Sequence, residues 1–288
     1  MTQIIKVLED NHSDTLRLRK LIAVCDKHGE TEHGQLRDLP PNCFKCAEEA
    51  RIKSEAEQKA KAKQEALERF TWHQKNNGIN PLGKKFDDWK YDDKQRERQE
   101  KIIAALNRYA ENFNSDLPNI LMIGGTGSGK TMLANAIAQT VFVKNHKGNS
   151  QFIDGKFVTT TFAEVNPSHL ITSSQITTKA KATWGDKFAS EDKFLEELGS
   201  YPLLIIDDLG DGDTSHNPEM AAADRNRLSQ VISKRYQKHP TIITTNMGQE
   251  EVTTFLGDRA WDRLQEKLVV IKCDWDSYRQ ATAKVSYL

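Results

Sequence analysis

The sequence lacks any segment that would place the protein in a membrane. No apolar run approaches the ~20 residues that a membrane-spanning helix needs. Residues 1–14, MTQIIKVLEDNHSD, lack the apolar core and small-residue cleavage site of a signal peptide. Charged residues make up 28% of the chain and apolar residues 37%, which is typical of a soluble protein. We therefore expect a cytoplasmic protein without a membrane partner.

The sequence also lacks net charge. Lys and Arg together number 41, and Asp and Glu together number 41. Overall charge therefore gives no argument for nucleic-acid binding, and any basic surface has to be local. The length of 288 residues allows one large domain or two smaller ones.

Cysteine is scarce, and its distribution favours a metal site. Three of the four cysteines lie within residues 25–46, which suits metal binding in a reducing compartment better than a disulfide framework. The candidate ligands are Cys25, His28, Cys43 and Cys46, in the order C-x-x-H, fourteen residues, C-x-x-C. Two such chelating pairs build a tetrahedral Cys3His zinc site, which is structural because its shell is closed. His33 is a competing fourth ligand with looser spacing.

The segments around this cluster indicate a small N-terminal module and a linker. Residues 3–24 place apolar residues among charges, a pattern that predicts one or two amphipathic helices. These helices could pack on themselves or form a surface that docks a partner. Residues 47–76 are rich in Ala, Glu, Lys and Gln without Gly or Pro, which predicts a long solvated helix. We expect residues 1–76 to form this zinc-stapled helical module and linker, and residues 77–288 a second domain.

The strongest motif is a glycine-rich turn between an apolar run, residues 120–123, and an apolar-periodic run, residues 132–143. Its spacing, G-x-x-x-x-G-K-T, is that of a phosphate-binding loop. Backbone N–H groups in such a loop, together with the start of the following helix, attract phosphate. The candidate nucleotide-binding residues are Gly125, Thr126, Gly127, Ser128, Gly129, Lys130 and Thr131. Lys130 is placed for the β- and γ-phosphates, and the Thr131 hydroxyl for Mg²⁺.

Two further buried strands end in polar residues. The run at 203–206 is followed by Asp207 and Asp208, and the run at 241–245 by Asn246. In an open α/β sheet, ligands bind at the carboxyl ends of the strands. Asp207 would hold Mg²⁺, Asp208 would orient and deprotonate the attacking water, and Asn246 would lie between that water and the phosphates.

Helices and strands expected between these motifs complete an α/β domain. We expect strands at 157–162 and 267–273, and helices at 93–113, 168–182, 191–198, 218–237 and 249–264. The result is a doubly wound, mainly parallel five-stranded sheet of the additional-strand ATPase type. Three aromatic residues upstream of the phosphate loop, Phe86, Trp89 and Tyr91, could pack on the adenine side of the site or serve as a plain hydrophobic staple.

The order of motifs resembles that of DnaC-type loaders of the bacterial replicative helicase. The resemblance rests on the phosphate loop, Ile206-Asp207-Asp208-Leu209-Gly210, Thr245-Asn246, Gly257-Asp258-Arg259 with Asp262-Arg263, and Trp275-Asp276-Ser277-Tyr278-Arg279. The stretch Arg108–Phe113 also resembles that family, and the similarity spans residues 78–288. The cysteine-histidine segment resembles the zinc-binding front end of phage- and prophage-borne relatives.

The resemblance implies an AAA+ ATPase that uses ATP and Mg²⁺. Such loaders grip a hexameric DnaB-type helicase with an N-terminal module, and their ATPase modules self-associate around single-stranded DNA. It implies that Arg263 or Arg259 reaches a neighbour's γ-phosphate, although both could instead pair with Asp258 and Asp262. Arg279 looks like a sensor of bound nucleotide. Lys179, Lys181 and Trp184 occupy the place of the DNA contacts.

Two departures from the family bear on activity. The second acid is usually Glu, and here it is Asp208, whose shorter side chain sets the carboxylate back and predicts slow hydrolysis. We also expect no full helical lid, because few residues follow the last expected strand. We expect a helicase loader for phage or prophage replication. The alternatives are a transposition helper ATPase that acts on duplex DNA, or a nucleotide-binding adaptor with negligible hydrolysis.

Overall fold

The computed structural model describes residues 4–13, 16–37, 39–79, 82–147, 150–153, 156–159, 161–184, 190–210 and 218–278. The chain divides into two compact units, residues 1–65 and residues 66–288. A long helix, α1 (Phe44–Asn76), begins in the first unit and ends in the second. The last turns of α1, where Phe70 and His73 are buried, belong to the second unit.

The first unit consists of a four-stranded antiparallel sheet and the first part of α1, and its residues 4–43 do not form the helices that the sequence predicted. Its strands, in the order β1-β2-β3-β4, are β1 (Ile4–Ser13), β2 (Leu16–Cys25), β3 (Gly29–Leu36) and β4 (Asn42–Cys43). The helical expectation for residues 3–24 is wrong. Leu21 and Ala23 are fully buried, and their cross-strand partners are His33 and Thr31. Alternate residues of β2 thus face one core, and this period of two is hard to distinguish from a short helical pattern.

The second unit contains a five-stranded parallel sheet in the order β11-β5-β10-β9-β8. The strands are β5 (Asn119–Ile123), β8 (Ser168–Thr172), β9 (Leu203–Leu209), β10 (Thr241–Thr245) and β11 (Leu268–Lys272). Strand β10 lies between β5, which leads into the phosphate loop, and β9, which carries the two aspartates. This order confirms the AAA+ P-loop fold with an additional central strand.

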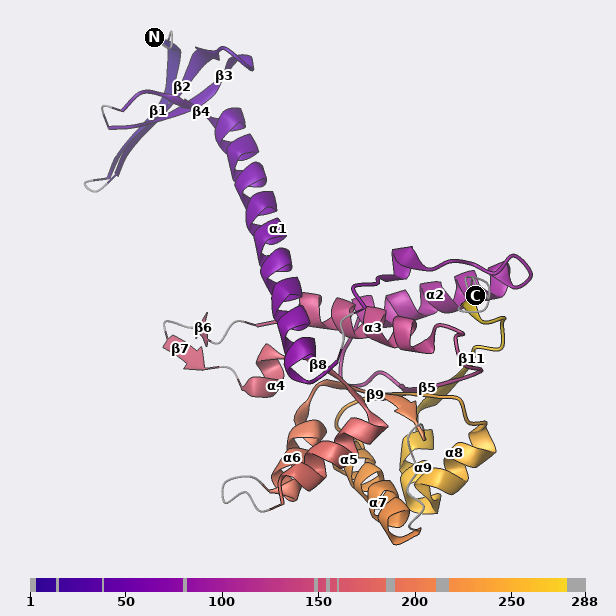
Figure 1. Ribbon diagram of the computed structural model, residues 1–288. Coiled ribbons are helices and arrows are strands. Elements are labelled where there is room, and N and C mark those ends of the chain that lie inside the picture. The colour runs from indigo at the N-terminus through magenta and orange to yellow at the C-terminus, as the bar shows by residue number, and fades with distance from the viewer. Residues whose placement is uncertain are drawn as a thin grey trace, which may run out of the picture. The chain divides into compact units, whose positions relative to one another are not determined.

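Helices cover both faces of this sheet (Figure 1). Helices α2 (Arg96–Glu111) and α3 (Lys130–Asn145) pack on one face, where Ile120 and Met122 of β5 point. Leu121 points to the opposite face. The helices on that face are α5 (Ser173–Ala182), α6 (Glu191–Ser200), α7 (Pro218–Arg235), α8 (Gln249–Leu256) and α9 (Asp258–Gln265). Because both faces are covered, the strands read as continuous apolar runs.

Several element boundaries differ from the sequence expectation. The strand expected at 157–162 is β7 (Lys156–Thr159), which pairs with β6 (Ser150–Ile153) in a separate two-stranded sheet. The stretch expected to be helical from residue 168 begins with β8, and α5 starts only after Thr172. The Thr172 hydroxyl accepts a hydrogen bond from the backbone N–H of Gln175 at 3.2 Å, a capping contact that begins the helix there.

The remaining elements are short. A 3₁₀ turn, η1 (Phe86–Asp88), precedes α2, and α4 (Phe162–Val165) precedes β8. The helix expected at 249–264 is divided into α8 and α9 at Gly257, whose φ of 76° ends the first helix. Across the described ranges, no helix combines the length and apolar character that crossing a bilayer requires.

Candidate nucleotide site and candidate metal centre

The phosphate loop joins the end of β5 to the start of α3. Lys130, the first residue of α3, turns its ammonium group back onto the loop, where it donates hydrogen bonds to the carbonyl oxygens of Gly124 at 2.8 Å and Gly125 at 2.9 Å. It also donates to Asn246 Oδ1 at 2.9 Å. The structure thus brings together two residues that are 116 positions apart, because parallel strands end at the same edge of a sheet.

The next side chain, Thr131, lies against the end of β9. Its hydroxyl donates to Asp207 Oδ1 at 3.2 Å, and the Thr244 hydroxyl donates to the same oxygen. Asp207 is only 3% exposed. Burial raises the pKa of this carboxyl above its ordinary value, and the hydrogen bond from Thr244 opposes that shift. A hydroxyl and a carboxylate side by side are the oxygen donors that Mg²⁺ takes, so Thr131 and Asp207 could hold this ion.

Lys130, Thr131 and Asn246 border a cavity of about 590 Å³, a size within the range of small-ligand sites. Among the lining residues are Leu82, Lys84, Trp89, Gly127, Gly129, Lys130, Thr131, Met132, Asp208, Asn246 and Tyr278. Of the three upstream aromatic residues, Trp89 lines the cavity and Phe86 belongs to the core. Tyr91 lies under Arg96, whose guanidinium carbon is 5.4 Å from the ring centroid.

The segment after β11 forms hydrogen bonds to the backbone of the phosphate loop. The indole N–H of Trp275 donates to the Ser128 carbonyl at 2.7 Å, and the Tyr278 N–H donates to the Gly127 carbonyl at 3.1 Å. Sequence reasoning missed the roles of these two residues, although the Trp-Asp-Ser-Tyr-Arg motif was the signal that could have found them. Arg279, the sensor expected from this motif, lies outside the described residues.

The two candidate finger arginines lie away from this cavity. Arg259 is exposed near the start of α9, and half-buried Arg263 donates to the Ser233 hydroxyl of α7. Both line a hollow of about 470 Å³ that contains no phosphate-loop residue. Within the described ranges, neither arginine forms an ion pair with Asp258 or Asp262.

The three candidate DNA contacts have partners within the protein. Lys179 is half-buried and donates to Asn77 Oδ1 at 2.8 Å, and burial lowers the pKa of its ammonium group. Lys181 lies 3.3 Å from a carboxylate oxygen of Asp224. Trp184 is 63% exposed, and its indole N–H donates to Glu191 Oε2 at 2.9 Å. Of the three, Trp184 offers the largest open surface.

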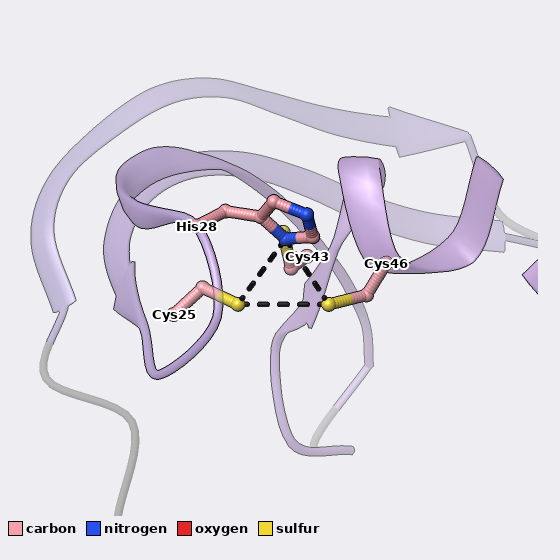
Figure 2. A group of neighbouring side chains, drawn as sticks. All are labelled: Cys25, His28, Cys43 and Cys46. Atoms are coloured by element: carbon pink, nitrogen blue, oxygen red, sulfur yellow. Dashed lines mark hydrogen bonds between the residues drawn. The ribbon is translucent and has the colours of Figure 1, made fainter. Parts of the chain in front are cut away.

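In the first unit, the four candidate zinc ligands converge (Figure 2). Cys25 ends β2 and His28 precedes β3, while Cys43 ends β4 and Cys46 lies in the first turn of α1. Their ligand atoms all lie within 4.8 Å of one another. The Cys25 Sγ–Cys46 Sγ distance is 3.6 Å, and the Cys46 Sγ–His28 Nδ1 distance is 3.4 Å. A tetrahedral zinc site separates such atoms by roughly 3.5–3.8 Å, so these residues could hold zinc.

The structure distinguishes between His28 and His33, the two candidates for the fourth zinc ligand. His28 directs Nδ1 toward the sulfur atoms, and its Nε2 lies 3.0 Å from Glu49 Oε1. A metal-binding histidine ordinarily donates a hydrogen bond from its second ring nitrogen to such a carboxylate. His33 is 2% exposed, and its Nδ1 lies 2.9 Å from the carbonyl oxygen of Thr31. His33 belongs to the core of the small sheet and lies outside the cysteine cluster.

Comparison with known proteins shows which proteins this chain resembles. The family of IstB-like ATP-binding proteins matches residues 179–286. The replicative helicase loader DnaC of Buchnera aphidicola (subsp. Acyrthosiphon pisum) is 28% identical over 198 residues, which cover 68% of this chain and 69% of the relative. The chain resembles the DnaC helicase loaders. The resemblance found in the sequence motifs is thus confirmed.

Two further similarities extend this comparison. A putative ATP-binding protein of insertion sequence IS5376 from Geobacillus stearothermophilus is 25% identical over 170 residues, which cover 56% of this chain and 55% of that protein. The crystal structure of the DnaC helicase loader aligns with a TM-score of 0.48 and 19% identity, over 66% of this chain and 97% of that one.

The DnaC-like unit brings together groups that could hold a nucleoside triphosphate. Its phosphate loop supplies backbone N–H groups and the Lys130 ammonium group, and the neighbouring strand ends supply two carboxylates and an amide. An ammonium group attracts phosphate oxygens, and a carboxylate at the cavity wall can accept a proton from water. These residues could therefore hold a nucleoside triphosphate.

Proposed function

We propose that this protein is an ATP-dependent loader that binds a DnaB-type replicative helicase and delivers it to single-stranded DNA, in phage or prophage replication. The observation that carries the proposal is the assembled nucleotide site in a chain whose similarity to helicase loaders spans 69% of the first relative. Residues 1–76 would bind the helicase and provide the linker, and residues 77–288 would bind nucleotide and DNA.

In this proposal each group of the cavity has one task. Lys130 turns from the loop carbonyls to the β- and γ-phosphates of ATP. Asp208 orients the attacking water and accepts its proton, and Asn246 donates its amide hydrogens between that water and the phosphate. Thr131 and Asp207 would hold Mg²⁺, which supplies neutralisation of phosphate charge when bound. The short Asp208 side chain predicts slow hydrolysis, which suits a timed release more than continuous motion.

Arginines would complete the site between neighbouring copies of the protein. Arg263 or Arg259 would reach the γ-phosphate on the adjacent subunit, because a guanidinium group stays charged and binds phosphate with two hydrogen bonds. The absence of ion pairs to Asp258 and Asp262 among the described residues supports this role. Arg279 would contact the nucleotide within its own subunit. Mixing Arg263→Ala subunits with Asp208→Asn subunits should then restore part of the hydrolysis, whereas no rescue would argue against Arg263.

Zinc would be bound by Cys25, His28, Cys43 and Cys46, so that the small sheet is held for helicase binding. Lys181 and Trp184, together with Lys179 if its contact to Asn77 opens, would face the DNA; an exposed tryptophan provides a stacking surface for bases. Lys130→Ala should abolish nucleotide binding and leave helicase binding intact. Loss of both activities would show that the two parts do not act independently.

The deciding experiment is co-purification with a DnaB-type hexamer, with and without ATP, followed by transfer of the helicase to single-stranded DNA. We expect capture of the hexamer by the full chain and ATP-dependent transfer. The relative from an insertion sequence supports one other candidate, a transposition helper ATPase. That protein would bind duplex DNA without a helicase, so duplex binding combined with no capture of the hexamer would favour it. Normal ATP binding without any turnover would instead favour an adaptor.

A further inference from the structure

Strand β9 contains a β-bulge where it reaches the nucleotide cavity. Along the pair with β10, β9 advances three residues, from Ile206 to Leu209, while β10 advances two, from Ile243 to Thr245. The extra residue falls at Asp207-Asp208, and Asp208 has a φ of 52°. Bulges next to active sites redirect a side chain. Here the bulge falls at Asp208, a residue that lines the nucleotide cavity.

The backbone of Asp208 is held on both sides by hydroxyl groups. Its N–H donates to Thr244 Oγ1 at 3.0 Å, and its carbonyl accepts a hydrogen bond from Ser173 Oγ at 2.8 Å. Thr244 is fully buried and Ser173 is 6% exposed. A bulged residue drops out of the regular ladder pairing of its strand. The two hydroxyl groups thus supply buried hydrogen-bond partners to the Asp208 backbone, which such groups ordinarily need.

The left-handed backbone also explains why an aspartate suits this position. Few residues other than glycine adopt positive φ, and Asp and Asn are enriched among them because their short polar side chains interact with the local backbone. The two hydroxyl contacts therefore stabilise a conformation that costs energy on its own. Neither Thr244 nor Ser173 lines the cavity, so both act on the chemistry only through Asp208 and, for Thr244, through Asp207.

We propose that Thr244 and Ser173 are positioning residues that hold the bulge in the conformation in which the Asp208 carboxylate faces the nucleotide cavity. This inference rests on the proposed ATPase function. Thr244 serves both acids at once, because its oxygen accepts from the Asp208 N–H while its proton goes to Asp207 Oδ1. Ser173, the first residue of α5, binds the carbonyl oxygen of the same residue, Asp208.

The test compares ATP turnover and nucleotide affinity in the full chain. Ser173→Ala and Thr244→Val should each lower kcat about 10- to 100-fold, since a displacement near 1 Å can cost about 100-fold. Nucleotide Kd should change less than about twofold for Ser173→Ala, because the phosphate loop is untouched. Thr244→Ser, which keeps the hydroxyl, should recover most of the turnover. Ser168→Ala is the matched control, because buried Ser168 on β8 makes one hydrogen bond to the Ala138 carbonyl, at 2.7 Å, outside the cavity.

The outcomes separate the two proposals. Equal turnover in Ser173→Ala, Ser168→Ala and the unchanged protein would overturn the positioning role while leaving the ATPase intact. Failure of Thr244→Ser to recover turnover, with normal folding, would overturn it for Thr244. Absence of turnover in the unchanged protein, with or without helicase and single-stranded DNA, would instead overturn the ATPase proposal, and with it any role in positioning a catalytic acid. If Thr244→Val fails to fold, Ser173→Ala still decides the question.

Discussion

His73, in the last turn of α1, and His169, on β8, share a buried hydrogen bond of 3.0 Å between Nε2 and Nδ1. The His169 ring stacks on Tyr201, with ring centroids 4.5 Å apart and an interplanar angle of 10°. One of the two rings has to accept this hydrogen bond, and only a neutral imidazole has an acceptor nitrogen, so the pair requires at least one uncharged ring. These contacts make the end of the long helix part of the ATPase core.

The buried pair predicts loss of stability in acid. Burial lowers the pKa of His73 to about 4 and that of His169 well below its usual range. The unfolded chain binds these protons near the ordinary value of ~6.5. The stability that depends on these two neutral histidines is therefore fully present above pH ~6.5, and it decreases as the pH drops toward 4. The shifted pKa of His73 alone should lower the free energy of unfolding by about 2 kcal/mol at pH 5. Urea unfolding at pH 7.5 and pH 5 measures this difference.

A variant without the titrating pair isolates this effect. His73→Phe with His169→Phe should show a smaller fall in unfolding free energy between the two pH values. His146→Gln is the control, because His146 stacks on Phe142 and its Nδ1 lies 2.6 Å from the Val165 carbonyl, apart from the pair. An unchanged difference in the double variant would show that other groups cause the acid sensitivity.

A second buried group, Arg235, binds the segments that lead into strands β9 and β10. Its guanidinium donates to the carbonyls of Leu198 at 3.0 Å, Tyr201 at 2.7 Å and Pro240 at 2.6 Å. Burial lowers the pKa of Arg235 to about 9, so it stays charged at neutral pH. Arg235→Met leaves these carbonyls without a donor and should reduce the free energy of unfolding by about 3 kcal/mol or more.

The matched comparison for Arg235 uses a lysine and a distant arginine. Arg235→Lys should recover little, because an ammonium group has three donors and lacks the planar fork of arginine. Arg108→Met, at an exposed position on α2, should change stability by less than about 0.5 kcal/mol. Full recovery by Arg235→Lys in chemical unfolding would show that charge and not geometry matters at this position.

A sequence reveals those features of the fold and of the site that depend on residues close together in the chain. The phosphate loop, the aspartates after β9 and Asn246 follow from a glycine pattern and from strands that end at one sheet edge. Strand β8 was mistaken for helix because its buried polar residues, Ser168 and His169, find partners only in the folded protein. The hydrogen bond from Trp275 to Ser128 links residues 147 positions apart, and no local pattern encodes such a contact.

The contact between Trp89 and Gly129 predicts two separable defects in nucleotide binding. A Cβ atom at Gly129 would lie 2.7 Å from the Trp89 ring, and Gly129 has a φ of 88°. Gly129→Ala should therefore abolish nucleotide binding for both steric and backbone reasons. Adding Trp89→Ala relieves only the steric conflict, so the double variant should still bind poorly in titrations with a fluorescent ATP analogue. Full restoration by the second substitution would show that the backbone conformation imposes no cost.

Helix α5 links the Asp208 backbone to the end of α1. Ser173 starts the helix, Gln175 Nε2 donates to the carbonyls of Asn77 at 3.3 Å and Gly78 at 3.1 Å, and Lys179 donates to the Asn77 side chain. Gln175→Ala should therefore lower ATP turnover a few-fold with little change in nucleotide affinity. Thr178→Ala is the control, because its hydroxyl bonds only to the Ser174 carbonyl within the same helix. Equal turnover in both variants would refute the link.

The carboxylate of Glu49 predicts how tightly the first unit holds zinc. Glu49 Oε1 lies 3.0 Å from His28 Nε2, and its second oxygen bonds to Lys27. It thereby orients the imidazole, so Glu49→Gln should weaken zinc binding about 10- to 100-fold. Glu48→Gln is a matched control, because the neighbouring Glu48 pairs with Arg51 at 2.6 Å and does not contact His28. Competition with a zinc-sensitive chelator measures both affinities in the full chain. Equal affinities would show that the ligand geometry does not depend on Glu49, and less than about one zinc per unchanged chain would refute the metal site itself.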